Sequence, residues 1–150
     1  MAENLNYNAS GSKCYDNSTA NCTTYGRLYD WATATTACPA GWHLPSDAEW
    51  TKLTDYVGGS STAGTKLKAS SGWYNSGNGI DDYGFSGLPG GYGISDGSFN
   101  DVGGYGYWWS ATENNASNAY YRYIIYYNEN VYRGYSDKDN YLISVRCLRD

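Results

Sequence analysis

A glycine-rich tract from residue 75 to residue 107, NSGNGIDDYGFSGLPGGYGISDGSFNDVGGYGY, constrains the fold of this chain more than any other segment. It has no helical period and too few β-branched residues for long strands, so it predicts loop structure ordered by aromatic side chains. A loop of this length is uncommon inside a compact domain and is usually functional. We therefore expect a domain that displays a long functional loop region.

Regular secondary structure is predicted on both sides of this tract. Residues 3–7 predict a short strand, and residues 25–38 predict a helix with one apolar face, which ends before Pro39 because proline cannot continue a helix. From YWWSAT onward, alternating runs such as YYRYIIYY and YLISVRCL predict strands joined by the hairpin-like turns NEN and YSDKDN. The order of strand, helices, loop tract and terminal antiparallel sheet predicts an α+β fold.

A second helix is predicted in the segment PSDAEWTKLTDYVGG. Ser46 is a candidate N-cap, and Glu49, three residues later, is its capping-box partner. Gly58 and Gly59 are typical of a helix end. The buried stripe of this helix is predicted from residues at spacings of three and four: Trp50, Leu53 and Val57.

Length and charge limit the architecture and the partners. A chain of 150 residues without an internal repeat or linker predicts one domain over residues 1–150. A net charge of −5 and no cluster of Lys or Arg argue against nucleic acid and anionic membranes as partners, since both need a basic patch. No apolar run approaches the ~20 residues of a membrane span, and the first ten residues lack the pattern of a signal peptide.

Cysteine usage points to an oxidising compartment. The chain has an even number of cysteines, with no CxxC pair among them: Cys14, Cys22, Cys38 and Cys147. Its single histidine disfavours a zinc site. Two disulfides fit best, and of the three possible pairings Cys14 with Cys22 and Cys38 with Cys147 is preferred. We therefore expect a secreted or cell-surface protein whose export signal lies outside this sequence; four reduced thiols in a cytosolic domain are the alternative.

Several motifs carry a family resemblance. CPAGWHLPSDAEW, LTDYVGG, AGTKLK, DDYGFSGLPGGYG, YWWSAT and SVRCLRD together resemble the Fibrobacter succinogenes major paralogous domain family. GWHLPSDAEW is also similar to the signature of formylglycine-generating-enzyme-like domains, a branch of the C-type lectin fold. The resemblance implies two helices flanking a small twisted antiparallel sheet, neighbouring termini and a long glycine-rich loop region. It also puts Cys38 and Cys147 where C-type lectins carry their long disulfide.

The same resemblance argues against an enzyme. The enzymatic branch uses a reactive cysteine pair near its C-terminus, where this chain has Cys147 alone. The Glu-Pro-Asn and Trp-Asn-Asp motifs that hold sugar-binding calcium in animal lectins are absent. His43 is a candidate general base, but no nucleophile and orienting acid accompany it in the sequence, so a packed turn histidine is favoured. We expect a non-enzymatic domain without a catalytic residue.

The C-terminal segment is similar to the variable proteins of diversity-generating retroelements, in which mutated adenines convert Asn codons to codons for Tyr, Asp, Ser and other residues. Its Ile and Val residues are suited to a fixed scaffold, whereas a set of Tyr, Asn, Ser and Asp residues matches the variable set. The predicted ligand-binding residues are Tyr105, Tyr107, Asn114, Asn115, Ser117, Asn118, Tyr120, Tyr121, Tyr123, Tyr126, Tyr127, Asn128, Asn130, Tyr132, Tyr135, Ser136, Asp137, Asp139 and Asn140.

Tyrosine suits a binding face because it offers a large contact area and only two of its side-chain torsions lose freedom on binding, while Ser and Asn supply adaptable hydrogen bonds. Arg122 and Arg133 are candidates for stacked or bidentate ligand contacts, or are ordinary surface cations. The ligand would be a protein or a glycan. Tyrosine is also simply a good strand former, so a structural or adhesive module of a bacterial surface protein is the alternative function.

Acidic residues in the glycine-rich tract are weak candidates for calcium, the one cofactor that the sequence suggests. Asp81 and Asp82 lie in a Gly/Asn/Asp loop that offers carboxylate and carbonyl oxygens. The motif departs from an EF-hand loop, and turn-forming aspartates are the favoured interpretation. Asp96 and Asp101 are likewise either calcium candidates or turn-forming residues.

Overall fold

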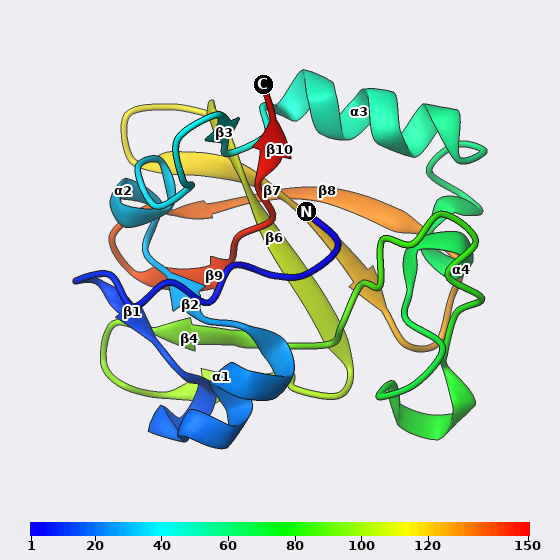
Figure 1. Ribbon diagram of the computed structural model, residues 1–150, viewed down its shortest axis with the longest axis horizontal. Coiled ribbons are helices and arrows are strands. Elements are labelled where there is room, and N and C mark those ends of the chain that lie inside the picture. Colours follow the sequence, from blue (N-terminus) through cyan, green and yellow to red (C-terminus); the bar gives the residue numbers. More distant parts are fainter.

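The computed structural model describes all residues, Met1–Asp150, and has an α+β fold with a mostly antiparallel sheet and few helices (Figure 1). Its strands are β1 (Ser12–Lys13), β2 (Leu28–Tyr29), β3 (Trp42–His43), β4 (Tyr92–Ile94), β5 (Phe99–Asn100), β6 (Tyr105–Glu113), β7 (Asn118–Ile125), β8 (Val131–Asp137), β9 (Tyr141–Ser144) and β10 (Leu148–Arg149). The main sheet has the order β1-β2-β9-β6-β7-β8, with β4 paired to β9 and β5 to β4, while β3 and β10 form a separate pair.

The helices are short and lie outside the central strands. They are α1 (Thr19–Tyr25), α2 (Trp31–Ala34), α3 (Asp47–Tyr56) and α4 (Ala63–Leu67), with 3-10 turns η1 (Tyr15–Asn17) and η2 (Tyr74–Ser76). None is long and apolar enough to cross a bilayer. The predicted capping box of α3 is confirmed: the Ser46 backbone N–H donates to the Glu49 carboxylate at 2.8 Å, and the Glu49 N–H donates to the Ser46 hydroxyl at 3.3 Å.

The helix predicted over residues 25–38 is wrong. Leu28 and Tyr29 form strand β2, which pairs with β1 and β9, and only Trp31–Ala34 is helical, with the Asp30 side chain as its N-cap. Both strand residues are fully buried. Their pairing partners on β9 lie more than a hundred positions later in the chain, so the local helical pattern is overridden by sheet pairing that no short window contains.

Three other local predictions need correction. Residues 3–7 form no strand, although the Leu5 N–H donates to the Val145 carbonyl at 2.8 Å. The glycine-rich tract is not loop throughout, because it contains the β4–β5 hairpin and the first residues of β6. The turn YSDKDN closes no hairpin, since β8 is an edge strand and β9 lies between β2 and β6, where it pairs with β6 in parallel.

Two apolar cores lie on opposite faces of β6 and β7. Consecutive residues of a strand point to opposite faces, so Trp108 and Trp109 enter different cores. Trp108 packs with Trp50 of α3, Leu67 of α4 and other buried side chains, whereas Trp109 packs with residues of β2, α2 and β9. The sheet is therefore anchored by α3 and α4 on one face.

The predicted disulfide pairing is present. Cys14 is bonded to Cys22 and Cys38 to Cys147, with sequence separations of 8 and 109. The second disulfide joins the segment after α2 to the segment before β10. The two chain termini also lie near each other, and the Met1 amino group donates to the Cys147 carbonyl at 2.8 Å (Figure 1). Paired cysteines of this kind are typical of extracellular proteins.

Candidate ligand-binding site

Seven tyrosines gather on the face of the sheet opposite α3. Along β6, β7 and β8 every second side chain points to this face, and strand register brings Tyr107 opposite Tyr123 and Tyr123 opposite Tyr132. Strands β4 and β9 add further rings at one end. We call this surface the tyrosine face; it comprises Tyr92, Tyr105, Tyr107, Tyr121, Tyr123, Tyr132 and Tyr141, all of which are half-buried.

The rings of the tyrosine face touch one another in a continuous series. Centroid separations are 4.8 Å from Tyr132 to Tyr123, 5.8 Å from Tyr123 to Tyr107 and 5.5 Å from Tyr107 to Tyr92. Tyr92 continues to Tyr141 at 5.4 Å. Offset and edge-on contacts at these separations add to the free energy of simple burial. Each ring is consequently held in place by its neighbours before any ligand arrives.

A pocket of about 160 Å³ opens at the β4 and β9 end of the tyrosine face. Four of the seven tyrosines line it, together with the β9 side chain of Ile143. Asp101, in the turn between β5 and β6, and Ser136 of β8 supply the other polar groups. The complete lining is Tyr92, Asp101, Tyr107, Tyr121, Ser136, Tyr141 and Ile143. The pocket thus combines aromatic walls, hydroxyl groups and one carboxylate.

The electrostatics of this pocket are dominated by Asp101. The Tyr107 hydroxyl donates to the Asp101 carboxylate at 2.8 Å, and burial together with this hydrogen bond raises the pKa of Tyr107 far above its usual value. Burial also raises the pKa of Tyr121. Both phenols are therefore neutral at physiological pH. Asp101 is exposed and has no ion-pair partner within 4.0 Å, so it contributes an uncompensated negative charge.

Asparagine side chains fix the far end of the tyrosine face. The amide groups of Asn128 and Asn130, in the turn between β7 and β8, donate to the Tyr132 hydroxyl at 2.9 and 3.1 Å. The Asn128 carboxamide oxygen in turn accepts a hydrogen bond from the Asn130 N–H at 3.1 Å. These contacts orient the Tyr132 ring and leave its hydroxyl lone pairs occupied.

The structure distributes the predicted ligand-binding residues over two faces and three turns. Five share the tyrosine face: Tyr105, Tyr107, Tyr121, Tyr123 and Tyr132. Ser136 lines the pocket, and Asn114, Asn115, Ser117 and Asn118 lie at the β6–β7 turn. Tyr126, Tyr127, Asn128 and Asn130 lie in the β7–β8 turn, and Asp137, Asp139 and Asn140 lie at the β8–β9 connection.

Tyr120 and Tyr135 belong to the opposite face. Their rings are in contact, with centroids 6.4 Å apart, and the Arg133 guanidinium lies 3.7 Å from the centroid of the Tyr120 ring. Arg133 also donates to the Asp47 carboxylate of α3 at 3.0 Å. These residues are therefore separated from the tyrosine face by the sheet itself.

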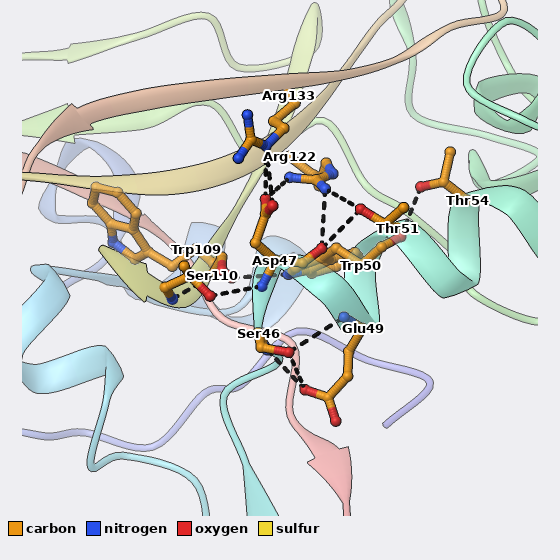
Figure 2. Close-up of polar contacts among 11 residues, drawn as sticks. Ser46, Asp47, Glu49, Trp50, Thr51, Thr54, Trp109, Ser110, Arg122 and Arg133 are labelled. Carbon is orange, nitrogen blue, oxygen red and sulfur yellow. Dashed lines mark hydrogen bonds and ion pairs between the residues drawn. The ribbon is translucent and has the colours of Figure 1, made fainter. Parts of the chain in front are cut away.

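Arg122 and Arg133 hold α3 against this opposite face (Figure 2). Arg122 is almost fully buried and donates to the Asp47 carboxylate at 2.6 Å and to the Thr51 hydroxyl at 3.0 Å. Burial acts to raise the pKa of the Asp47 carboxyl, but the hydrogen bonds and charges of the two arginines outweigh it and hold that pKa below its usual value. Both arginines are engaged within the domain, in an ion-pair network that fixes the helix.

Two pocket tyrosines, Tyr92 and Tyr141, are absent from the predicted ligand-binding residues. Tyr92 lies in the glycine-rich tract, where it belongs to β4 and not to a loop. Tyr141 and the buried Ile143 are two residues apart in β9 and therefore point to the same face of the sheet. This alternation in the sequence could have identified Tyr141 as a residue of that face. Asp101 was considered only as a calcium or turn residue.

The other sequence candidates lie away from the tyrosine face. His43 of β3 contacts the Asp150 and Glu49 carboxylates at 2.6 and 3.1 Å. The Asp81 carboxylate accepts hydrogen bonds from the backbone N–H and the hydroxyl of Ser86 at 2.7 and 2.6 Å, and Asp82 is exposed. The structure contains no group of three or more His, Cys, Asp or Glu side chains arranged to hold a metal ion.

Comparison with known protein families identifies the domain. The family model described as the Fibrobacter succinogenes major domain matches residues 1–149. The chain belongs to this family. No curated protein and no solved structure matches this Fibrobacter succinogenes major domain. Its function must therefore be argued from its own side chains.

Two motifs that carry the resemblance have clear structural roles in this Fibrobacter succinogenes major domain. HLPSDAEW supplies the Ser46–Glu49 capping box and Trp50, whose ring packs from α3 against Trp108 of the sheet. SVRCLRD supplies Cys147 and the buried Arg146, which donates to the Asn4 side chain at 2.9 Å and also to the Phe85 carbonyl. Both motifs stabilise the scaffold and lie outside the tyrosine face.

Proposed function

We propose that this protein is a non-enzymatic recognition domain that binds its ligand on the tyrosine face. The observation that carries the proposal is the continuous series of seven half-buried tyrosines on the face opposite α3, beside the core around Trp109. Half-buried rings present apolar surface that is costly to leave in water. A ligand that covers them gains this apolar contact together with hydrogen bonds to the phenol groups.

The rigidity of the surface supports binding over a purely structural role. The rings are held by mutual contacts and by the amides that bind the Tyr132 hydroxyl, so little side-chain entropy remains to be lost when a ligand binds. Tyrosine combined with Asn, Ser and Asp is the residue set of antibody paratopes. Three connections at the edges of the sheet carry the same set, which extends the available contact area around the face.

We further propose that the fold is C-type lectin-like and that the protein is the variable protein of a diversity-generating retroelement, exported to the cell surface or beyond. Neighbouring termini, the Cys38–Cys147 disulfide and helices beside a small antiparallel sheet support the fold. The disulfides support export. Five of the proposed variable positions share one face, which supports diversification of a single binding surface.

The genomic neighbourhood provides the test. We expect a reverse-transcriptase gene and a near-copy of the codons for residues 105–147 that differs only at adenines. Among sister copies, differences should fall at tyrosine-face positions such as Tyr107 and Tyr123, whereas Arg122 and Asp47, which fix α3, should not vary. Absence of both genetic elements, or variation spread equally over the two faces, would refute diversified recognition.

A further inference from the structure

The residues that line the pocket beside Asp101 favour a positively charged ligand group. Its walls carry the phenol groups of Tyr92, Tyr107, Tyr121 and Tyr141, and its only charged group is the Asp101 carboxylate. Neutral phenol hydroxyls do not cancel that charge. Aromatic rings attract cations through the negative electrostatic potential of their π-systems, and a carboxylate adds direct Coulomb attraction.

We propose that this pocket binds an ammonium group, and specifically an N-methylated or quaternary ammonium presented by the ligand. This inference rests on the proposed recognition function, because it names the chemical group that the tyrosine face takes. Groups of aromatic rings are the arrangement in which methylated ammonium groups are recognised, and a carboxylate beside them adds Coulomb attraction. The methyl groups contact the rings while the positive charge lies near Asp101.

The size of the pocket supports a head group as its occupant. Pockets that enclose drug-sized ligands measure about 300 to 1,000 Å³, whereas this one measures about 160 Å³. It therefore takes one compact group of a larger ligand, whose remainder lies across the tyrosine face. The net charge of −5 favours the approach of a cationic ligand.

Four larger hollows of the domain lack this combination. Two of them, of about 400 and 350 Å³, are lined by residues 1–6 and by Leu5, Tyr7 and residues 36–39. A third, of about 380 Å³, contains Glu3 among Asn and Thr residues, but Tyr25 is its only aromatic residue. Another, of about 200 Å³, is apolar and contains the Arg146 guanidinium, which repels cations. Of these five hollows, only the pocket beside Asp101 joins several aromatic rings to a carboxylate that has no basic partner.

The test titrates the folded wild-type protein with choline and with its uncharged isostere 3,3-dimethylbutan-1-ol, following tyrosine ring resonances by NMR. The two probes have nearly the same shape and differ in charge. We expect choline to shift the pocket tyrosines and to bind about tenfold more tightly than the isostere, since a cation–π contact with a nearby carboxylate contributes about 1 to 2 kcal/mol.

Two variants with the same change of net charge locate the effect. Asp101→Asn should weaken choline binding about five- to tenfold and leave binding of the isostere unchanged, whereas Asp82→Asn, at an exposed position outside the pocket, should leave both unchanged. Tyr141→Leu should weaken choline binding, and Tyr141→Phe should preserve most of it because the ring remains. Circular dichroism verifies that each variant is folded.

Equal affinity for choline and its isostere would overturn the proposal, as would loss of choline binding in Asp82→Asn to the same extent as in Asp101→Asn. Binding of a methyl hexoside without binding of choline would also overturn it, while leaving recognition by the tyrosine face intact. If no probe binds, the ammonium site is refuted, and the proposed function is decided separately by the pattern of variation among gene copies.

Discussion

Removing the long disulfide should destabilise the domain about twice as much as removing the short one. The perturbation is a pair of double variants, Cys38→Ala with Cys147→Ala and Cys14→Ala with Cys22→Ala. In the chain-entropy description a disulfide restricts the unfolded chain, and its effect grows with the logarithm of the loop that it closes. The two variants therefore differ mainly in the loop that they release.

The magnitudes follow from the sequence separations of 109 and 8 residues. At 25 °C they correspond to about 5 kcal/mol for Cys38–Cys147 and about 2.5 kcal/mol for Cys14–Cys22. Cys147, Cys14 and Cys22 are all buried, so both variants also lose some sulfur packing, and this contribution largely cancels in the comparison. The difference of about 2.3 kcal/mol corresponds to about 5 to 9 °C in Tm for a domain of this size.

The assay is urea unfolding followed by tryptophan fluorescence, with the free energy of unfolding of each variant extrapolated to water with its own m-value, because the longer released loop expands the unfolded chain. Thiol titration of the denatured, unreduced wild type comes first and should find no free cysteine. Equal losses in the two variants, or a larger loss for the short loop, would refute the loop-entropy reasoning. Four free thiols before reduction would refute the pairing itself.

Three further variants test the scaffold, the site and the pH dependence of stability. Asp47→Asn should cost about 3 kcal/mol in urea unfolding because it leaves the buried Arg122 without a counter-ion. Gly134→Ala should shift the ring resonances of Tyr121 and narrow the pocket, since a Cβ at position 134 would lie 2.6 Å from that ring. Hydrogen bonds to Asp150 and Glu49 raise the pKa of His43. The stabilising contribution of the protonated His43 is therefore complete below about pH 6.5, and it is lost as pH rises through the folded-state pKa. Over this pH range Tm should fall in the wild type but not in His43→Gln.

Features that depend on neighbouring residues were predictable from the sequence. The Ser46–Glu49 capping box and the glycines that end α3 lie within one short segment, where the backbone needs of a helix terminus specify residue types. Alternation in YYRYIIYY likewise identified β7, because strand geometry imposes a period of two. The preferred disulfide pairing was also correct.

The pairing of strands that lie far apart in the chain was not predictable from local patterns. Leu28 has a helical pattern around it, yet it pairs with Ser144 in β9. Gly93 of β4 pairs with Leu142, which brings Tyr92 beside Tyr141 and thereby forms one end of the pocket. The free energy that favours these arrangements comes from contacts between segments far apart in the chain, and a local window contains neither partner.

The two-faced distribution of tyrosines in β7 follows from the two tasks of that strand. Tyr120 stacks with Arg133 and thereby supports the cation that binds Asp47, so a change at this position acts on the attachment of α3. Tyr121, one residue later, lines the pocket, so a change there acts on the tyrosine face. Because adjacent strand residues point to opposite faces, one short segment both anchors the scaffold and contributes to the tyrosine face. Substitutions that alter the tyrosine face without loss of stability are consequently expected at the half-buried Tyr121 and Tyr123, and not at Arg122 or Ile124, whose side chains are buried on the face that α3 covers.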